Sequence, residues 1–411
     1  MHVSGEHFDV AIGGGGTVGL VLACALADAL GAGVRIAVLD PAPLDGAGPR
    51  DPRASALAAG SKRLLEALGV WAPIARDAQP VTAIDITDSR LDDAIRPILL
   101  SYDNRLEDQE PASYIVENER LRQTLIAAAH ARPAVALLGG SAIGDFAADQ
   151  HGVTLRLASG TLRAGVLIAA DGRASRLRDS AGIKLLRWDY PQAGIVTTVA
   201  HSRPHGGRAL QHFLPTGPFA ILPLPQDRSA ITWTEDATVA RALLALDEAG
   251  FAAELAKRFD YRLGEVTQIG ARAAWPLEMQ LARALIADRL ALVGDAARVV
   301  HPIAGQGLNL GLRDVAALTE VITDAARLGL DTGAAMVLER YQRWRRLDSA
   351  LSAATYDGLN RLFSNDWMLM RTARDFGLAL VDQLPALKQF FVAEAAGLSG
   401  EIPKLLRGEL P

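Results

Sequence analysis

A run of glycines near the start of the chain has a spacing that suits the binding of a phosphate group. Residues Gly14–Gly19 read G-G-G-T-V-G and fit the pattern G-x-G-x-x-G. In such a turn Gly14 permits a tight bend, Gly16 lets the backbone approach a pyrophosphate, and Gly19 lets a helix pack closely on a strand. The run therefore predicts a dinucleotide site.

The elements that must hold this turn are present on both sides of it. The pattern predicts a strand, a helix and a second strand at residues 8–12, 17–30 and 34–39. The helix would begin at Thr17 and Val18, and its free N–H groups and positive dipole end would face the phosphates. Asp40 closes the second strand about 20 residues after the glycines, where a carboxylate can accept hydrogen bonds from ribose hydroxyls. Together they predict a βαβ unit that binds NAD or FAD.

A second segment favours FAD over NAD. An apolar strand at 289–293 ends in Gly294-Asp295, and a glycine-rich stretch then opens a helix. The Asp295 carboxylate is placed to bind a ribityl hydroxyl, and NAD needs no such group. Backbone N–H groups at the helix start would face the flavin pyrimidine edge, where reduced flavin is negative. The residues concerned are Gly305, Gly307, Leu308 and Asn309. On spacing alone, an ordinary glycine-rich loop remains the alternative.

The composition is that of an ordinary globular chain. It has 411 residues, half of them apolar, and a net charge of −5, which favours neither a nucleic-acid partner nor an anionic membrane surface. The single cysteine, Cys24, excludes an intrachain disulfide, fits a reducing, cytoplasmic compartment and is expected in the core. The eight histidines lack metal-site spacing, so no metal is predicted. The uncharged run 10–27 contains four consecutive glycines, so a buried strand and helix explain it better than a membrane span.

The pattern of apolar and polar residues in the rest of the chain predicts an α/β fold in two interleaved domains. A Rossmann-like domain would comprise residues 1–80, 112–184 and 281–336. A β-sheet-rich domain would comprise residues 81–111 and 185–280, with a helical insertion at about 237–259. Residues 337–411 are expected to be C-terminal helices. Further helices are expected at 61–68, 118–130 and 306–327, and one extended segment at 135–143.

The most specific pattern runs from His301 to Asp314 and reads H-P-I-A-G-Q-G-L-N-L-G-L-R-D. It resembles, without a gap, the signature of the ubiquinone-biosynthesis hydroxylases, which are FAD-dependent class A flavoprotein monooxygenases of the para-hydroxybenzoate hydroxylase fold. Residues 51–57 with 68–71, residues 116–118 and the tail 397–400 resemble further segments of that family. The resemblance covers nearly the whole chain and implies the interleaved fold, with substrate bound by the β-rich domain.

The resemblance also gives roles to residues whose own patterns are weaker. Arg53 would lie beside the flavin and its phosphates, where a planar donor fork suits anions, and Asn118 would contact the cofactor. Asp171 begins an Asp-Gly pair associated with FAD and with the pyrophosphate of the nicotinamide cofactor, although the residues alone indicate a loop anchor. Pro302 would shape the wall beside the flavin ring, and Gly305 opens the helix that stabilises flavin charge. The candidate catalytic residues are therefore Pro302, Gly305 and Arg53.

The reaction implied is the hydroxylation of an aromatic ring. NADH or NADPH would reduce the flavin, and O2 would add at flavin C4a to give a hydroperoxide that attacks an electron-rich phenol. The resemblance implies a polyprenylated phenol of ubiquinone biosynthesis, at the 2-octaprenyl-6-methoxyphenol step. Residues 185–280 resemble the family only loosely, so no catalytic side chain of the family can be assigned to a position in this range.

Alternative functions share the same flavin motifs. One is the hydroxylation of a small soluble phenol, and another is a non-catalytic, flavin-binding role in a quinone-synthesis complex. A flavin-dependent halogenase is disfavoured, because the chain has no Trp-x-Trp-x-Ile-Pro stretch. The apolar stretch 378–392 is expected to pack in the core or at a subunit interface, and peripheral membrane contact is the other possibility.

Overall fold

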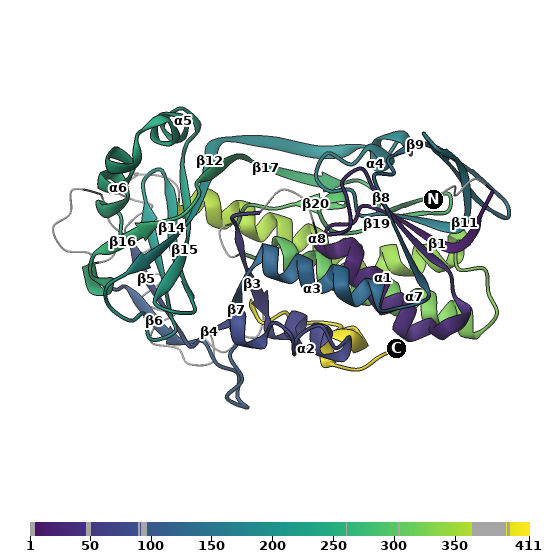
Figure 1. Ribbon diagram of the computed structural model, residues 1–411, viewed down its shortest axis with the longest axis horizontal. Coiled ribbons are helices and arrows are strands. Elements are labelled where there is room, and N and C mark those ends of the chain that lie inside the picture. Colours follow the sequence, from purple (N-terminus) through teal and green to yellow (C-terminus); the bar gives the residue numbers. More distant parts are fainter. Residues whose placement is uncertain are drawn as a thin grey trace.

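The computed structural model describes residues 5–46, 51–88, 91, 97–259, 261–302, 305–363, 392 and 395–411. Two large sheets lie side by side, and the longest helices fill the region under and between them (Figure 1). The long strands β12 (Leu185–His201) and β17 (Ala273–Ala282) run across the top of the view from one sheet toward the other. They link the two halves of the molecule.

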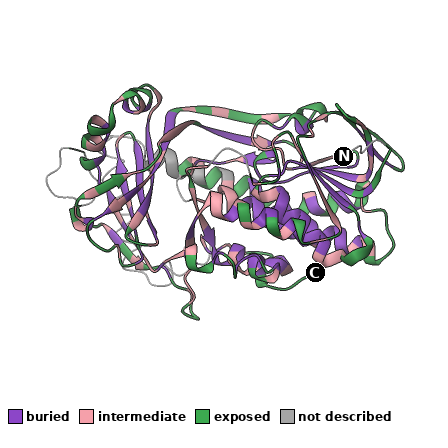
Figure 2. Cartoon of the chain, in the orientation of Figure 1, coloured by how far each residue is buried: buried purple, intermediate pink, exposed green. Residues whose placement is uncertain are grey.

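The first sheet has eight strands in the order β18-β19-β11-β1-β2-β8, with β10 and β9 continuing from β11. Its core strands β19, β11, β1, β2 and β8 are parallel. All but the edge strand β8 are largely buried (Figure 2), as expected when helices cover both faces of a parallel sheet. The strands are β1 (His7–Gly13), β2 (Ile36–Asp40), β8 (Val135–Gly139), β9 (Ile143–Asp149), β10 (Gly152–Leu157), β11 (Gly160–Ala169), β18 (Ile286–Ala287) and β19 (Leu290–Leu292). The helices that share its core are α1 (Thr17–Leu30), α3 (Asn118–His130), α7 (Gly307–Arg327) and α8 (Ala335–Phe363).

The second sheet has nine strands in the order β20-β17-β12-β15-β14-β13-β5-β6, with β16 beside β12. One face packs against α5 (Ala237–Ala245) and α6 (Glu248–Ala256) around the buried Trp233. The remaining strands are β5 (Ala83–Asp88), β6 (Leu100–Asp103), β13 (Arg208–Leu214), β14 (Gly217–Leu224), β15 (Arg228–Asp236), β16 (Val266–Ile269) and β20 (Arg298–Val299).

A small third sheet joins the two halves. It has the order β3-β7-β4. Its apolar residues pack against Ala209 and Leu224 of the second sheet. Its strands, with the helices that follow them and the short helical turns, are β3 (Ala54–Ala58), β4 (Gln79–Val81), β7 (Ser113–Glu117), α2 (Ala59–Ala67), α4 (Arg176–Ser180), η1 (Gly31–Gly33), η2 (Ala75–Asp77), η3 (Tyr261–Leu263), η4 (Gly294–Ala296) and η6 (Lys404–Arg407).

The structure confirms the predicted α/β fold and most of its elements, with three differences. Residues 54–58, for which no element is predicted, form a strand because they pair with β7, and α2 starts at Ala59 rather than at Ser61. The extended segment 135–143 is interrupted at Gly140, which turns with φ +72° before β9 begins. Residues 397–411 are not the predicted helix: they are irregular apart from η6, because Leu405 and Leu406 are buried in the main core.

The predicted domain limits can be compared with the residues that form the two large sheets. Strands from 83–103 and 185–282 build the second sheet, but β20 from the predicted flavin-binding part also joins it, through Arg298 opposite Leu281. The limits themselves stay a prediction. The apolar stretch 378–391 lies outside the described residues, whereas Val392 is buried beside Ala59. Cys24 is buried in the core, as expected.

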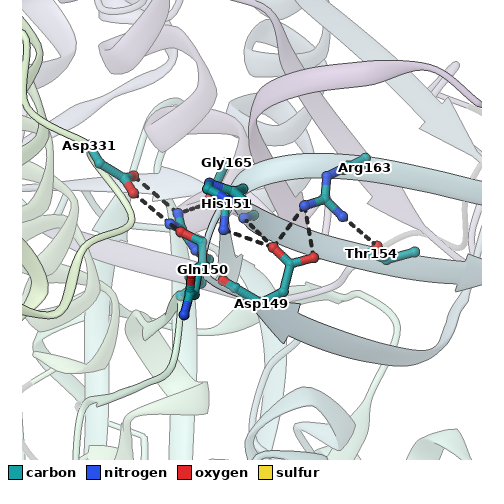
Figure 3. A network of polar contacts seen from close by, with 9 residues as sticks. Asp149, Gln150, His151, Thr154, Arg163, Gly165 and Asp331 are labelled. Carbon is teal, nitrogen blue, oxygen red and sulfur yellow. Dashed lines mark hydrogen bonds and ion pairs between the residues drawn. The ribbon is translucent and has the colours of Figure 1, made fainter.

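Arg289 fixes the start of the strand that leads to Asp295. It has φ +53°, and its guanidinium donates to the carbonyl oxygens of Asp149 and Gly165 at 2.8 and 2.9 Å and forms an ion pair with Asp331. Figure 3 shows how Asp331 and the β9–β10 turn meet at this edge, where Arg163 also pairs with Asp149. A charged network thereby holds the end of the first sheet on the side opposite the glycine-rich turn.

Candidate active site

The glycine-rich turn leaves no room for side chains where the backbone is packed, and leaves open space where a ligand would approach. A Cβ on Gly14, which has φ +115°, would lie 2.3 Å from the Ala170 carbonyl oxygen, and one on Gly19 would lie 2.0 Å from the Gly14 carbonyl oxygen. Gly16 has no heavy atom within 4 Å of the same position and is exposed. The tight bend and the open approach both match the roles predicted for these glycines.

Helix α1 presents its first N–H groups to that open space. Its first backbone hydrogen bond runs from the Leu20 N–H to the Gly16 carbonyl at 3.0 Å, so the amides of Thr17 and Val18 point out of the helix end. No acidic residue occupies the first turn and no side chain caps it. This end is therefore suited to an anion such as a pyrophosphate.

Asp40 lies at the end of β2, beside the same turn. Its two carboxylate oxygens accept hydrogen bonds from the N–H groups of Gly15 and Ala42, both at 2.7 Å. The side chain thus stabilises the turn directly. Each oxygen keeps a second lone pair, so the ribose contact stays a prediction.

Asp295 lies in a recess between the segments. Its side chain is exposed, yet burial within the surrounding protein raises the pKa of its carboxyl, against the opposing charges of Arg53, Arg298 and Arg173. A bound molecule can therefore reach this carboxylate, and the many protein groups around it disfavour its charged form. This is the environment that the ribityl role of Asp295 requires.

A buried charge cluster, which the sequence reasoning did not single out, positions this loop. Asp314 of α7 accepts a hydrogen bond from the Gly294 N–H at 3.0 Å and ion pairs from Arg298 and Arg345, at 2.7 and 2.8 Å. All three charged side chains are almost completely buried. Removing one partner from such a cluster is strongly destabilising. Asp314 is the last residue of the segment 301–314, which carries the family resemblance. That position is the signal by which the sequence could have identified Asp314.

Arg53 and Asn118 meet on one carboxylate. Asp51 pairs with Arg53 at 2.6 Å and accepts from the Asn118 amide at 3.0 Å. Burial alone would raise the pKa of Asp51, but these hydrogen bonds outweigh it and hold that pKa below its usual value. The Arg53 guanidinium also lies 5.1 Å from the centre of the Trp275 ring of the second sheet, and its charge acts on Asp295. Arg53 therefore contacts both halves of the molecule.

Helix α7 begins beside these groups. Gly305 has φ +63° and its N–H bonds the Pro302 carbonyl at 2.9 Å, which turns the chain into the helix at Gly307. The amides of Gly307 and Leu308 then lead the helix. The Asn309 side chain is fully used within the protein: it accepts from the Ala58 N–H and Ser61 Oγ and donates to the Ala56 and Gly305 carbonyls. Any cofactor contact by Asn309 must come from its backbone.

Asp171 acts as a loop anchor. Its carboxylate accepts from Ser175 Oγ at 2.5 Å and from the Leu177 N–H at 3.2 Å, which fixes the start of α4. Beyond it lies an open cavity of about 550 Å³ between the two halves of the molecule. Its charged lining includes Arg173, Arg178, Arg187, Asp189 and Glu278. A cofactor contact by Asp171 itself remains a prediction.

The three predicted segments come together in one place, and their donor chemistry fits FAD. Val18 of the glycine-rich turn packs on Gly294 and Gly311, and Asn309 joins α7 to β3. The combined surface offers helix N-termini for phosphates and flavin, an accessible carboxylate for hydroxyls and an arginine for anions. Among the described residues no His/Cys/Asp/Glu group could hold a metal, and no helix has the length and hydrophobicity needed to cross a bilayer.

Pro302 faces the second sheet across a narrow cavity. The lining residues of that sheet are Gln211, Pro218, Ala220, Thr232 and Thr234. The neighbouring His301 is buried, lies 5.4 Å from the Tyr190 ring, and has a pKa lowered to about 4 by burial, against the opposing charge of Asp357. Sequence reasoning named none of these sheet residues, because nothing in their local pattern marks them.

Comparison with known proteins agrees with this fold and site. The FAD binding domain family matches residues 7–350. The ubiquinone hydroxylase UbiL of Rhodospirillum rubrum is 44% identical, over 97% of this chain and 92% of its own length. The 3-demethoxyubiquinol 3-hydroxylase of Escherichia coli is 35% identical, over 96% and 100%. The crystal structure of p-nitrophenol 4-monooxygenase from Pseudomonas putida superposes with a TM-score of 0.79 at 20% identity, over 96% and 99%.

The fold, the site and the relatives together define an FAD-dependent monooxygenase. The chain belongs to the FAD binding domain family, and its curated relatives include hydroxylases of ubiquinone biosynthesis. The recognition made from residues 301–314 is thereby confirmed, as are the fold class and the cofactor. The individual roles of the site residues stay predictions.

Proposed function

We propose that this protein hydroxylates the aromatic ring of a polyprenylated phenol in ubiquinone biosynthesis. The observation that carries the proposal is the full-length similarity, at 44% identity, to a relative named as a ubiquinone hydroxylase. The site supports it physically: the predicted flavin loop with Pro302 faces a sheet whose cavity is lined by apolar and neutral polar side chains. A phenol ring is apolar with neutral oxygen substituents, so this lining suits it.

The overall reaction consumes one phenol, one O2, one NADH or NADPH and one proton. It yields the hydroxylated ring, water and the oxidised nicotinamide. FAD, when bound, supplies the redox chemistry that reduces O2 and delivers one of its oxygen atoms to the ring. The protein must bind and orient both reactants and keep bulk water out.

The chain's own groups divide that work. The N–H groups of Thr17 and Val18 hold the pyrophosphate, and Asp295 binds the ribityl chain. The amides that open α7, after Gly305, stabilise negative charge on the flavin ring. Arg53 balances nearby phosphate charge. Pro302 forms the rigid wall between the flavin and the phenol.

The nicotinamide cofactor is proposed to bind in the open cavity beside the Asp171 loop. That cavity has a volume of about 550 Å³ and is lined by Arg173 and Arg187, whose charges would attract a pyrophosphate. Asp189 and Glu278 already pair with Arg187, so binding would exchange those contacts.

The protein is proposed to work in the cytoplasm, with peripheral contact to the membrane that dissolves its prenylated substrate. Contact with other proteins of quinone synthesis belongs to the same proposal. The alternatives are a hydroxylase of small soluble phenols and a non-catalytic flavoprotein of such a complex.

Deletion of the gene, followed by mass analysis of accumulated quinone precursors, tests the proposal. We expect a prenylated phenol lacking one ring oxygen to accumulate, and its structure names the ring position. The purified protein should also hydroxylate that phenol with NADH or NADPH and O2. Unchanged quinone content, together with coupled turnover of a water-soluble phenol, would favour the first alternative. Bound flavin without oxygen-dependent turnover would favour the second.

A further inference from the structure

The inner face of the second sheet changes character at the level of Pro302. We use "inner face" for the residues of β13, β14 and β15 that line this cavity: Gln211, Pro218, Ala220, Thr232 and Thr234. Lower on the same side, Ala209, Leu224 and Ala230 pack against the third sheet, and the opposite face is an apolar core around Trp233. Polar side chains therefore occupy this sheet just where it faces Pro302.

The register places these side chains on adjacent strands. Gln211 pairs with Ala220, and Ala220 pairs with Thr232, so the three share one row, and Thr234 lies two residues further along β15. Two strand spacings across the sheet and two residues along β15 put the backbones of Gln211 and Thr234 roughly 12 Å apart. Two side chains at that separation can reach oxygen substituents on one aromatic ring.

Two polar atoms of the inner face are buried without a partner. Among the residues that the structure describes, neither Gln211 Nε2 nor Thr234 Oγ1 has a hydrogen-bond partner, and both atoms are shielded from solvent. A buried, unpaired donor is destabilising, and one that lines a cavity can be paired by a ligand or by an ordered water. Pro218 and Ala220 lie between them and offer an apolar floor.

The chemistry of these two atoms describes the ligand. An amide N–H only donates, so Gln211 suits an oxygen that only accepts, such as an ether. A hydroxyl both donates and accepts, so Thr234 suits a phenol hydroxyl. The space is narrow, about 10 Å³, which is room for about one water molecule. A ring must therefore move Pro302 away from the sheet as it enters.

We infer that Gln211 and Thr234 orient the substrate ring: Thr234 binds the phenol hydroxyl and Gln211 binds a second ring oxygen of the methoxy type. This rests on the proposed function and deepens it, because the two contacts decide which ring carbon faces the flavin. Neither residue takes part in flavin binding. They determine specificity and coupling rather than cofactor content.

The test uses two substitutions that keep side-chain volume, Gln211→Met and Thr234→Val, in the FAD-loaded protein. The probes are 2-methoxy-6-prenylphenol and 2-prenylphenol, whose binding is followed by the change in flavin absorbance. Gln211→Met should weaken binding of the methoxylated probe about fivefold to tenfold and leave the other unchanged. Thr234→Val should weaken both. Each variant should raise the fraction of NADH oxidation that yields hydrogen peroxide.

Stability and a matched control separate this from a structural role. Since each substitution removes a buried unpaired group, the melting temperature and flavin content should stay equal or rise. Thr197→Val, on the opposite face, loses a 3.2 Å hydrogen bond to the Gly270 carbonyl and should lower the melting temperature without changing probe affinity. Lower stability of the two variants with unchanged probe affinity and coupling overturns the inference. If wild-type protein bound and hydroxylated neither probe, the proposed function would fail instead.

Discussion

The two walls of the proposed active site differ in the groups that line them: backbone groups line one wall and side chains line the other. The flavin-side wall, residues 14–19 and 294–309, depends on backbone: helix N-termini, close glycine contacts and turns with positive φ at Gly14, Gly294 and Gly305. The sheet-side wall is the inner face, which acts through side chains of three strands. A backbone wall tolerates almost no substitution, whereas a side-chain wall can change its ligand without losing the fold. In the proposed site, cofactor recognition and substrate recognition are thereby separated.

The strongest test of the backbone wall compares two of its glycines. Gly14→Ala should cost about 3 kcal/mol or more of folding stability, because the new Cβ would overlap the Ala170 carbonyl at a positive φ. Gly16→Ala should fold normally, since its Cβ would meet open space, yet it should bind FAD much more weakly. Thermal unfolding and flavin titration measure the two effects. Full FAD affinity in Gly16→Ala would remove the pyrophosphate from this turn.

His301, at the junction of the two walls, should make stability depend on pH. Burial lowers its pKa from 6.5 to about 4, so between these values the unfolded chain binds a proton that the folded protein refuses. Stability is complete above about pH 6.5 and falls as the pH drops, by about 2 kcal/mol at pH 5 and about 3 kcal/mol at pH 4.

His301→Phe keeps an aromatic ring beside Tyr190 and removes the imidazole that binds this proton in the unfolded chain. Urea unfolding at pH 7 and pH 5 should show a smaller loss in the variant than in the wild type. Titrating groups that do not interact with His301, such as His201, are common to both proteins and cancel in the difference. Parallel pH profiles would mean that His301 finds a polar partner.

These contrasts explain what the sequence could predict. The ranges of α1 and α3 and the buried strands follow from glycine spacing and hydrophobic period, which are local. The convergence of Gly14–Gly19 with Asp295 is predicted from the FAD-binding pattern and from the family resemblance. Gln211 and Thr234 could not be found, since their neighbourhood is created by strand register across β13, β14 and β15. Nor could local pattern show that the Asn309 amide is consumed by β3 and α2, more than 240 residues away.

Asp295 is the side chain of the flavin-side wall that is predicted to bind the ribityl chain. Asp295→Ala should weaken FAD binding about 30-fold or more in a folded protein, because charged hydrogen bonds to the ribityl chain are lost. Flavin occupancy after gel filtration measures this, with circular dichroism as the check on folding. Asp295→Asn should recover part of the affinity. An unchanged flavin content in the alanine variant would contradict the ribityl role.

Arg53 should show the smallest effect, because its side chain is half exposed and already paired with Asp51. Arg53→Ala should weaken FAD binding about fivefold and slow flavin reduction, since a positive charge near the phosphates and Asp295 is lost. Arg35→Ala is the matched control: Arg35 is similarly exposed and pairs with Glu6 at 2.9 Å, away from the site. If both variants kept wild-type affinity and reduction kinetics, Arg53 would be only a surface ion-pair partner. If Arg53→Ala alone changed the coupling of NADH oxidation to hydroxylation, its contact with Trp275 would extend the flavin-side wall to the second sheet.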